Sequence, residues 1–233
     1  MNNFNINAYD APALDKQVSQ VMKRVYVKMF LALLVTSFVA WIIGTSHQFL
    51  YFMVTHSWGY WGLMLAELGM VIAISAAINK MSSSMATLLF YLFAIVNGAV
   101  FSIILSVYTA DSIFKTFLIT AGVFGAMSVY GYFTDRDLTK MGTFLYMALW
   151  GLIIAIVVNI FWANSTLEWI ISIAGVLIFV GLTAWDTQKI KQMAAQMPNA
   201  TDGRLATIGA LSLYLDFINL FLYLLRFFGN SRD

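Results

Sequence analysis

The feature that constrains this chain most is a succession of long apolar segments, each about the length needed to cross a lipid bilayer. A transmembrane helix needs roughly 20 predominantly apolar residues. A lipid core accepts only helices or closed barrels, because every backbone polar group must be paired there, and no strand-like alternation competes with these segments. We therefore expect seven transmembrane helices at 25–45, 60–78, 86–109, 113–133, 142–163, 167–187 and 205–228.

Composition excludes the other broad classes of protein. Of the 233 residues, 61% are hydrophobic and only 10% are charged, whereas soluble domains have about 45–50% apolar and about 25% charged residues. A net charge of +2 argues against a nucleic-acid-binding protein. The chain has no cysteine, which excludes disulfides and thiolate metal sites. The expected fold class is an all-α polytopic membrane protein.

The chain divides into a polar tail over 1–24, a single seven-helix domain over 25–228 and a short C-terminal tail over 229–233. Apolar residues recur at helical spacing through this tail and into the first span, at Leu14, Val18, Val21 and Val25 among polar neighbours. Two alternatives remain open for this tail. It is an interfacial helix that lies on the membrane, or it is the helical start of the first span.

The basic residues are distributed unequally between the two sides that these spans define. Three lie on the side of the C-terminus: Lys115, Arg226 and Arg232. Ten lie on the side of the N-terminus: Lys16, Lys23, Arg24, Lys28, Lys80, Arg136, Lys140, Lys189, Lys191 and Arg204. The positive-inside rule then predicts a cytoplasmic N-terminus and an external C-terminus. We expect a bacterial inner (plasma) membrane location.

Small residues spaced by four predict places where helices approach closely. Such pairs are Gly98 with Ser102 in the third span and Gly122 with Ala126 in the fourth. Small side chains at this spacing let two backbones come near one another, so we interpret these pairs as packing features.

Three carboxylates lie within the expected spans: Glu67, Asp186 and Asp216. An ionisable group in hydrocarbon is costly unless it is paired, solvated or neutralised, so each is a functional candidate. Asp216 lies about eleven residues into the last span, roughly 16 Å deep. A polar stripe follows one face of that helix at i, i+4, i+7 and i+11. Its members are Ser212, Asp216, Asn219 and Tyr223.

Asp186 ends the span before the last one, and consecutive spans run antiparallel, so Asp186 and Asp216 can approach at similar depth. Two nearby carboxylates in a low dielectric cannot both ionise freely. Such a pair suits a proton-controlled latch, a proton relay, a calcium ligand set or a hydrolytic dyad. Asp186 alone also fits a surface ion pair with Lys189 at i+3.

Glu67 lies in the second span, and two interpretations of it remain open. It faces the same interior cavity as Asp216, or it pairs with a buried polar group such as Asn97 or Asn159 and serves packing alone.

Enzyme classes fit poorly. Intramembrane aspartyl proteases carry a Gly-x-Gly-Asp motif, whereas the contexts here are Ala184-Trp185-Asp186 and Tyr214-Leu215-Asp216. A retinal protein needs a lysine in its last span, and the span over 205–228 has none. We expect neither an enzymatic activity nor a cofactor.

Several of these runs together resemble the Bax inhibitor-1 (TMBIM) family, and in particular its bacterial branch. The resemblance covers about residues 20–230. It rests on the runs Leu211-Ser212-Leu213-Tyr214-Leu215-Asp216-Phe217-Ile218-Asn219-Leu220-Phe221, Leu224-Leu225-Arg226, Trp185-Asp186-Thr187-Gln188 and Glu67-Leu68-Gly69.

The resemblance implies a seven-helix fold with the last helix in the centre, and a pH-sensitive calcium leak. It implies that Asp186 and Asp216 form a di-aspartyl pH sensor. A basic residue of the second helix locks this pair in the bacterial branch, and Lys80 is the nearest candidate here.

Two functions are therefore expected. The first is a calcium or other cation leak gated by protonation of the aspartate pair, which also serves as a candidate calcium site. Its cavity would be lined by Glu67, Ser212, Asn219 and Tyr223. The alternative is a regulator that binds and restrains another membrane protein, such as a quality-control protease, through the tail over 1–24.

Overall fold

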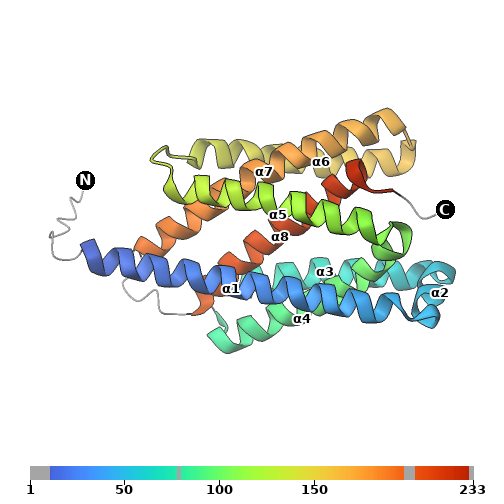
Figure 1. Ribbon diagram of the computed structural model, residues 1–233, viewed down its shortest axis with the longest axis horizontal. Coiled ribbons are helices and arrows are strands. Elements are labelled where there is room, and N and C mark those ends of the chain that lie inside the picture. The colour runs from blue at the N-terminus through green and yellow to red at the C-terminus, as the bar shows by residue number, and fades with distance from the viewer. Residues whose placement is uncertain (1–10, 78–79, 197–202, 231–233) are drawn as a thin grey trace.

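A computed structural model describes residues 11–77, 80–196 and 203–230 of the chain (Figure 1). These residues form a bundle of helices whose axes run mostly along its longest direction. The helices are α1 (Ala11–Gly44), α2 (His47–Thr55), α3 (Ser57–Ala77), α4 (Ser83–Val107), α5 (Ala110–Phe133), α6 (Thr139–Trp162), α7 (Ser165–Gln196) and α8 (Gly203–Phe228).

The expected spans fall on α1 and on α3 to α8. Six of these helices, all except α3, are long and apolar enough to cross a membrane. The apolar part of α3, Trp61–Ala77, is shorter, so its passage across the membrane stays a prediction. The sequence pattern missed α2, a short helix that begins after Ser46, whose side chain accepts a hydrogen bond from the Phe49 backbone N–H. The chain is a multi-pass helical membrane protein.

The polar segment before the first span belongs to a continuous helix. The 34 residues of α1 correspond to roughly 50 Å at 1.5 Å per residue, longer than a hydrocarbon core of about 30 Å. Val18, Val21 and Val25 are all buried, so the first turns of α1 pack into the bundle. Residues 11–24 therefore belong to the same helix as the first span, and where they lie relative to the membrane stays a prediction. The tail residues 1–10 lie outside the described part.

The last helix is the central one. It packs against α1, α4, α5 and α7 and runs obliquely through the middle of the bundle (Figure 1). Leu213, Tyr214 and Leu220 on α8 have no exposed surface. The outer helices are the reverse. On α6, Trp150 is 66% exposed and Phe161 is 86% exposed, as expected for a surface that faces lipid.

Close helix approach occurs at some of the expected glycines and not at others. A Cβ atom built on Gly98 would lie 2.8 Å from the Thr36 carbonyl oxygen, so the prediction for Gly98 is confirmed. Gly122 has nothing within 4 Å of that position, so the prediction of a contact there is wrong. On α5 the close approach is at Gly131, whose Cβ would clash with the backbone of Ala184. Spacing alone does not say which face of a helix meets a neighbour.

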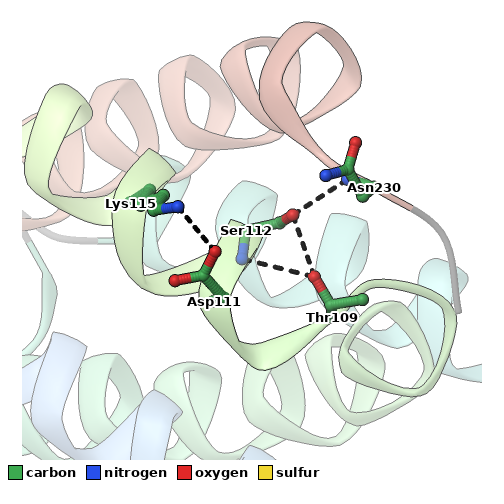
Figure 2. Close-up of polar contacts among 5 residues, drawn as sticks. All are labelled: Thr109, Asp111, Ser112, Lys115 and Asn230. Atoms are coloured by element: carbon green, nitrogen blue, oxygen red, sulfur yellow. Dashed lines mark hydrogen bonds and ion pairs between the residues drawn. The ribbon is translucent and has the colours of Figure 1, made fainter.

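The C-terminal end of α8 is tied to the start of α5 (Figure 2). The Asn230 N–H donates to Ser112 Oγ at 2.9 Å, as Figure 2 shows. The Thr109 N–H donates to the Asn230 carbonyl oxygen at 3.0 Å. An exposed ion pair of 2.7 Å joins Asp111 and Lys115 beside them. Figure 1 shows that α1 begins at one end of the long axis and α8 finishes at the other.

Candidate functional site

Both aspartates lie on helices that pack against each other, Asp186 on α7 and Asp216 on α8. Asp186 on α7 is 4% exposed, and Ser212 Oγ on α8 donates to its Oδ2 at 2.7 Å. Asp216 is also 4% exposed and follows Ser212 by four residues, so it lies one turn further along the same face of α8. The charges of the two carboxylates are close enough to interact. We call this contact the acidic seam, defined by Asp186, Ser212 and Asp216.

Asp216 is the least satisfied member of the acidic seam. Its Oδ2 atom is buried and receives no hydrogen bond from any described residue. Three buried hydroxyl groups in the described chain also make no hydrogen bond. They belong to Thr187 on α7 and to Thr116 and Ser128 on α5. Helices α5, α7 and α8 pack against one another. A buried carboxylate in such surroundings must carry a proton, contact water or bind a cation.

Lys189 does not neutralise Asp186 by a direct ion pair. Its Nζ atom lies 4.6 Å from the centre of the Trp185 ring, and among the described contacts no ion pair joins Lys189 to Asp186. Because Asp186 is also buried, the structure does not form the surface pair that the i, i+3 spacing allowed. Tyr146 of α6 packs against the Trp185 ring at 5.3 Å and is within electrostatic reach of both aspartates. Sequence spacing gave no signal for Tyr146.

Of the remaining stripe residues on α8, Tyr223 also contacts α7. Tyr223 stacks on Phe179 with ring centres 5.9 Å apart, and its ring fills the space over Gly175. Asn219 donates from Nδ2 to the Leu215 carbonyl oxygen of its own helix at 2.8 Å. The polar stripe therefore continues the acidic seam along one side of α8.

Gln188, two residues after Asp186, anchors the loop between α5 and α6. Its Oε1 accepts from the Leu138 N–H at 2.9 Å, and its Nε2 donates to the Arg136 carbonyl oxygen at 2.8 Å. Lys191 adds a bond of 2.7 Å to the Tyr132 carbonyl oxygen. The end of α7 therefore connects the acidic seam to this loop.

Glu67 belongs to a different cluster. Asn97 Nδ2 on α4 donates to Glu67 Oε1 at 2.7 Å, and Tyr214 of α8 lies 3.0 Å from Asn97 Oδ1. Tyr214 and Asp216 are two residues apart, about 200° around the helix, so they point to opposite sides of α8. The structure therefore pairs Glu67 with Asn97, one of the two packing partners that the sequence suggested, and does not bring it to the aspartates.

The surroundings of Lys80 and Lys28 differ from those that the sequence suggested. Lys80 is exposed beyond α3, and no described hydrogen bond or ion pair joins it to either aspartate. Lys28 of α1 is half-buried, and its Nζ donates to Thr87 Oγ1 at 2.7 Å and Thr207 Oγ1 at 2.6 Å. Lys28 thus joins α1, α4 and α8, a role that its position in the sequence did not indicate.

The described residues offer few metal ligands and one pocket of note. No three His, Cys, Asp or Glu side chains within this part of the chain gather around a common point, so a cation at the seam would rest on two carboxylates and neighbouring hydroxyls. A mostly apolar pocket of about 660 Å³ lies between α1, α4, α5 and α8. Thr36 and Phe217 line this pocket, and neither aspartate does.

The fold is that of a polytopic membrane protein whose central helix carries a buried acid at its contact with a neighbouring helix. Comparison with known proteins identifies the family. The family model described as inhibitor of apoptosis-promoting Bax1 matches residues 18–233. The chain therefore belongs to the Bax inhibitor-1 family, as the runs on α7 and α8 indicated.

Bacterial proteins are among its relatives. The chain is 47% identical over 214 residues to the inner membrane protein YbhL of Escherichia coli K12, covering 91% of this chain and 92% of the relative. It is 45% identical over 217 residues to an uncharacterized protein of Borreliella burgdorferi, with 92% and 94% covered. It is 44% identical over 220 residues to the uncharacterized protein RP147 of Rickettsia prowazekii, with 94% and 93% covered.

Proposed function

We propose that this protein is a cation leak, with calcium as the cargo, and that protonation of Asp186 and Asp216 gates it. One observation carries the proposal. Asp216 is buried with an oxygen that receives no hydrogen bond from the described residues, one turn from the serine that holds Asp186. Two acids in this arrangement are most stable when they share a proton.

The gating mechanism has two states. With a proton between the carboxylates, the acidic seam holds α7 to α8. Loss of that proton leaves two like charges in a low dielectric, which repel unless a cation neutralises them. The seam then needs water or a cation, and either requires α7 and α8 to separate locally.

The chemistry of the seam suits a hard cation. Calcium prefers oxygen ligands, carboxylates above all. Asp186 and Asp216 supply carboxylate oxygens and Ser212 a hydroxyl oxygen where the two helices pack together. Two carboxylates are fewer than a tight calcium site uses. A conduction path needs binding that is weak enough to release the ion, so this ligand set favours a leak over a storage site. The path continues past Asn219 and Tyr223, and Glu67 lies outside it.

We infer that the protein resides in the bacterial inner membrane with its N-terminus in the cytoplasm. The name of the YbhL relative supports the membrane. The excess of basic residues on the N-terminal side supports the orientation, and α1 starts opposite the end where α8 finishes.

The test is calcium flux through purified protein in liposomes that contain a calcium-sensitive dye. We expect flux above that of protein-free liposomes, with a rate that changes between about pH 6 and about pH 8 as the pair titrates. Asp111→Asn is the matched control, because its carboxylate is exposed in an ion pair with Lys115, and we expect its flux to follow the wild type. Folded protein that passes no calcium would contradict the leak and favour the regulator of another membrane protein.

A further inference from the structure

A continuous chain of hydrogen bonds crosses the bundle on the side of α8 opposite the acidic seam. It runs from Glu67 on α3 to Asn97 on α4 at 2.7 Å, and from Asn97 to Tyr214 on α8 at 3.0 Å. Tyr214 then lies 2.7 Å from Thr36 Oγ1 on α1, and Thr36 donates to the Ala94 carbonyl oxygen at 3.0 Å. These four contacts join four helices, and we call them the Glu67 network.

The number of hydrogen bonds that the Glu67 network can form depends on whether Glu67 carries a proton. With an ionised Glu67, the Asn97 amide must point its NH₂ group at the carboxylate, and its Oδ1 then takes the Tyr214 proton. Thr36 has one proton, which the Ala94 carbonyl oxygen takes. The contact of 2.7 Å between Thr36 and Tyr214 then has two oxygens and no hydrogen, so three donors serve four contacts.

A protonated Glu67 removes this deficit. Its O–H donates to Asn97 once the amide turns over, which exchanges Oδ1 and Nδ2 within the same volume. The Asn97 NH₂ group then donates to Tyr214, Tyr214 donates to Thr36, and Thr36 donates to the Ala94 carbonyl oxygen. Four donors now serve four contacts, and every hydrogen bond runs in one direction.

Among the described residues, no charged group contacts Glu67 in a way that would favour its ionised form. Glu67 is the one charged residue of α3, which packs mainly against α4 and α2. The titratable residues of those helices are Tyr91 on α4, and Tyr51 and His47 on α2, the last with its side chain outside the described set. The network adds Tyr214. The described hydrogen bond of the Glu67 carboxyl goes to Asn97, an uncharged group.

We propose that Glu67 is a second protonation site, and that its proton sets the orientation of the Asn97 amide and so the hydrogen bonds that hold Tyr214. The ligand of this site is a proton taken up at the half-buried face of α3. The proposal goes beyond the calcium leak and does not depend on it, because the Glu67 network shares no residue with the acidic seam. If both hold, α8 responds to protons on both of its sides.

Labelling with dicyclohexylcarbodiimide tests the protonation state. This apolar reagent adds to carboxyl groups that carry a proton in apolar surroundings, and mass spectrometry locates the adduct. In protein held in lipid nanodiscs near neutral pH, we expect the adduct at Glu67 well above the level at the exposed acids Asp111 and Glu168. The adduct should fall as pH rises. Labelling of Glu67 no greater than that of the two exposed acids would overturn the proposal.

Tyrosine variants test the network itself. Tyr214→Phe removes the hydroxyl that makes the protonated arrangement better by one hydrogen bond, so Glu67 labelling at fixed pH should fall about fivefold to tenfold. Tyr91→Phe is the matched control, since its hydroxyl makes no described contact with the network, and labelling should stay at the wild-type level. Thr36→Val removes the same advantage from the other end of the chain and serves if Tyr214→Phe does not fold. Equal labelling in the network variants and the control would overturn the role of Asn97 and Tyr214.

Discussion

At the scale of single residues, the face of α8 that carries Asp216 was predictable, whereas the partner of Glu67 was not. The spacing of Ser212 and Asp216 placed them on one face because helical periodicity is fixed. The partner of Glu67 depends on how α3 is rotated against α4. Glu67 is the one charged residue of α3, and the sequence left both the cavity and the packing alternative open for it. The structure has Asn97 beside it.

Ser212 gives a residue-scale prediction. Ser212→Ala removes the described side-chain donor to Asp186 Oδ2 and leaves a buried carboxyl oxygen without it, which costs about 1–3 kcal/mol. We expect a lower free energy of unfolding in detergent, measured by chemical denaturation. Ser106→Ala is the control, because Ser106 is exposed and its hydroxyl bonds only to Ile103 of its own helix. The same small loss in both variants would contradict a special role for Ser212.

At the scale of elements, the existence of the helices was predictable and their ends were less so. Apolar length located seven of the eight helices that the described residues form, but it underestimated α7, which continues to Gln196. The extension carries Gln188, which bonds to the α5–α6 loop, and Lys191, which bonds to the last turn of α5. Both lie beyond the apolar run that defined the span. The hydropathy pattern indicates where the segment within the lipid ends, whereas the helix itself continues for as long as tertiary contacts support it.

The α5–α6 loop gives an element-scale prediction about pH. The pKa of the exposed Asp137 lies below its usual range. The largest cause is a hydrogen bond from the Thr139 side chain, followed by one from the Thr139 backbone N–H and by the charge of Lys140. Because the pKa of Asp137 is lower in the folded state, its ionised carboxylate stabilises the fold. This stabilisation is present above the unfolded-state pKa of about 3.9 and is lost as pH falls through the folded-state pKa.

Asp137→Ala should therefore lower the melting temperature at neutral pH, and the difference from wild type should shrink as pH falls below about 4. Asp135→Ala is the control in the same exposed loop, and we expect little change at either pH. A deficit in Asp137→Ala that is the same at neutral and acidic pH would contradict this role for its charge.

At the scale of the whole molecule, the central position of α8 brings two separate polar clusters to its opposite sides. The acidic seam joins it to α7, and the Glu67 network joins it to α1, α3 and α4. The resemblance of the α8 run to the Bax inhibitor-1 family implied the central helix. The separation of Glu67 from the aspartates needed the three-dimensional arrangement, because it follows from which neighbours surround α8.

The central claim is that protonation of the Asp186 and Asp216 pair gates calcium flux, and substitution of Asp216 tests it most directly. Asn keeps the shape of the side chain and can neither gain nor lose a proton in the relevant range. Calcium flux into liposomes should be measured for wild type and Asp216→Asn across about pH 6 to about pH 8. The account predicts a pH-dependent rate for wild type and a rate for Asp216→Asn that no longer follows pH. Identical pH-dependent flux in the two proteins would contradict it.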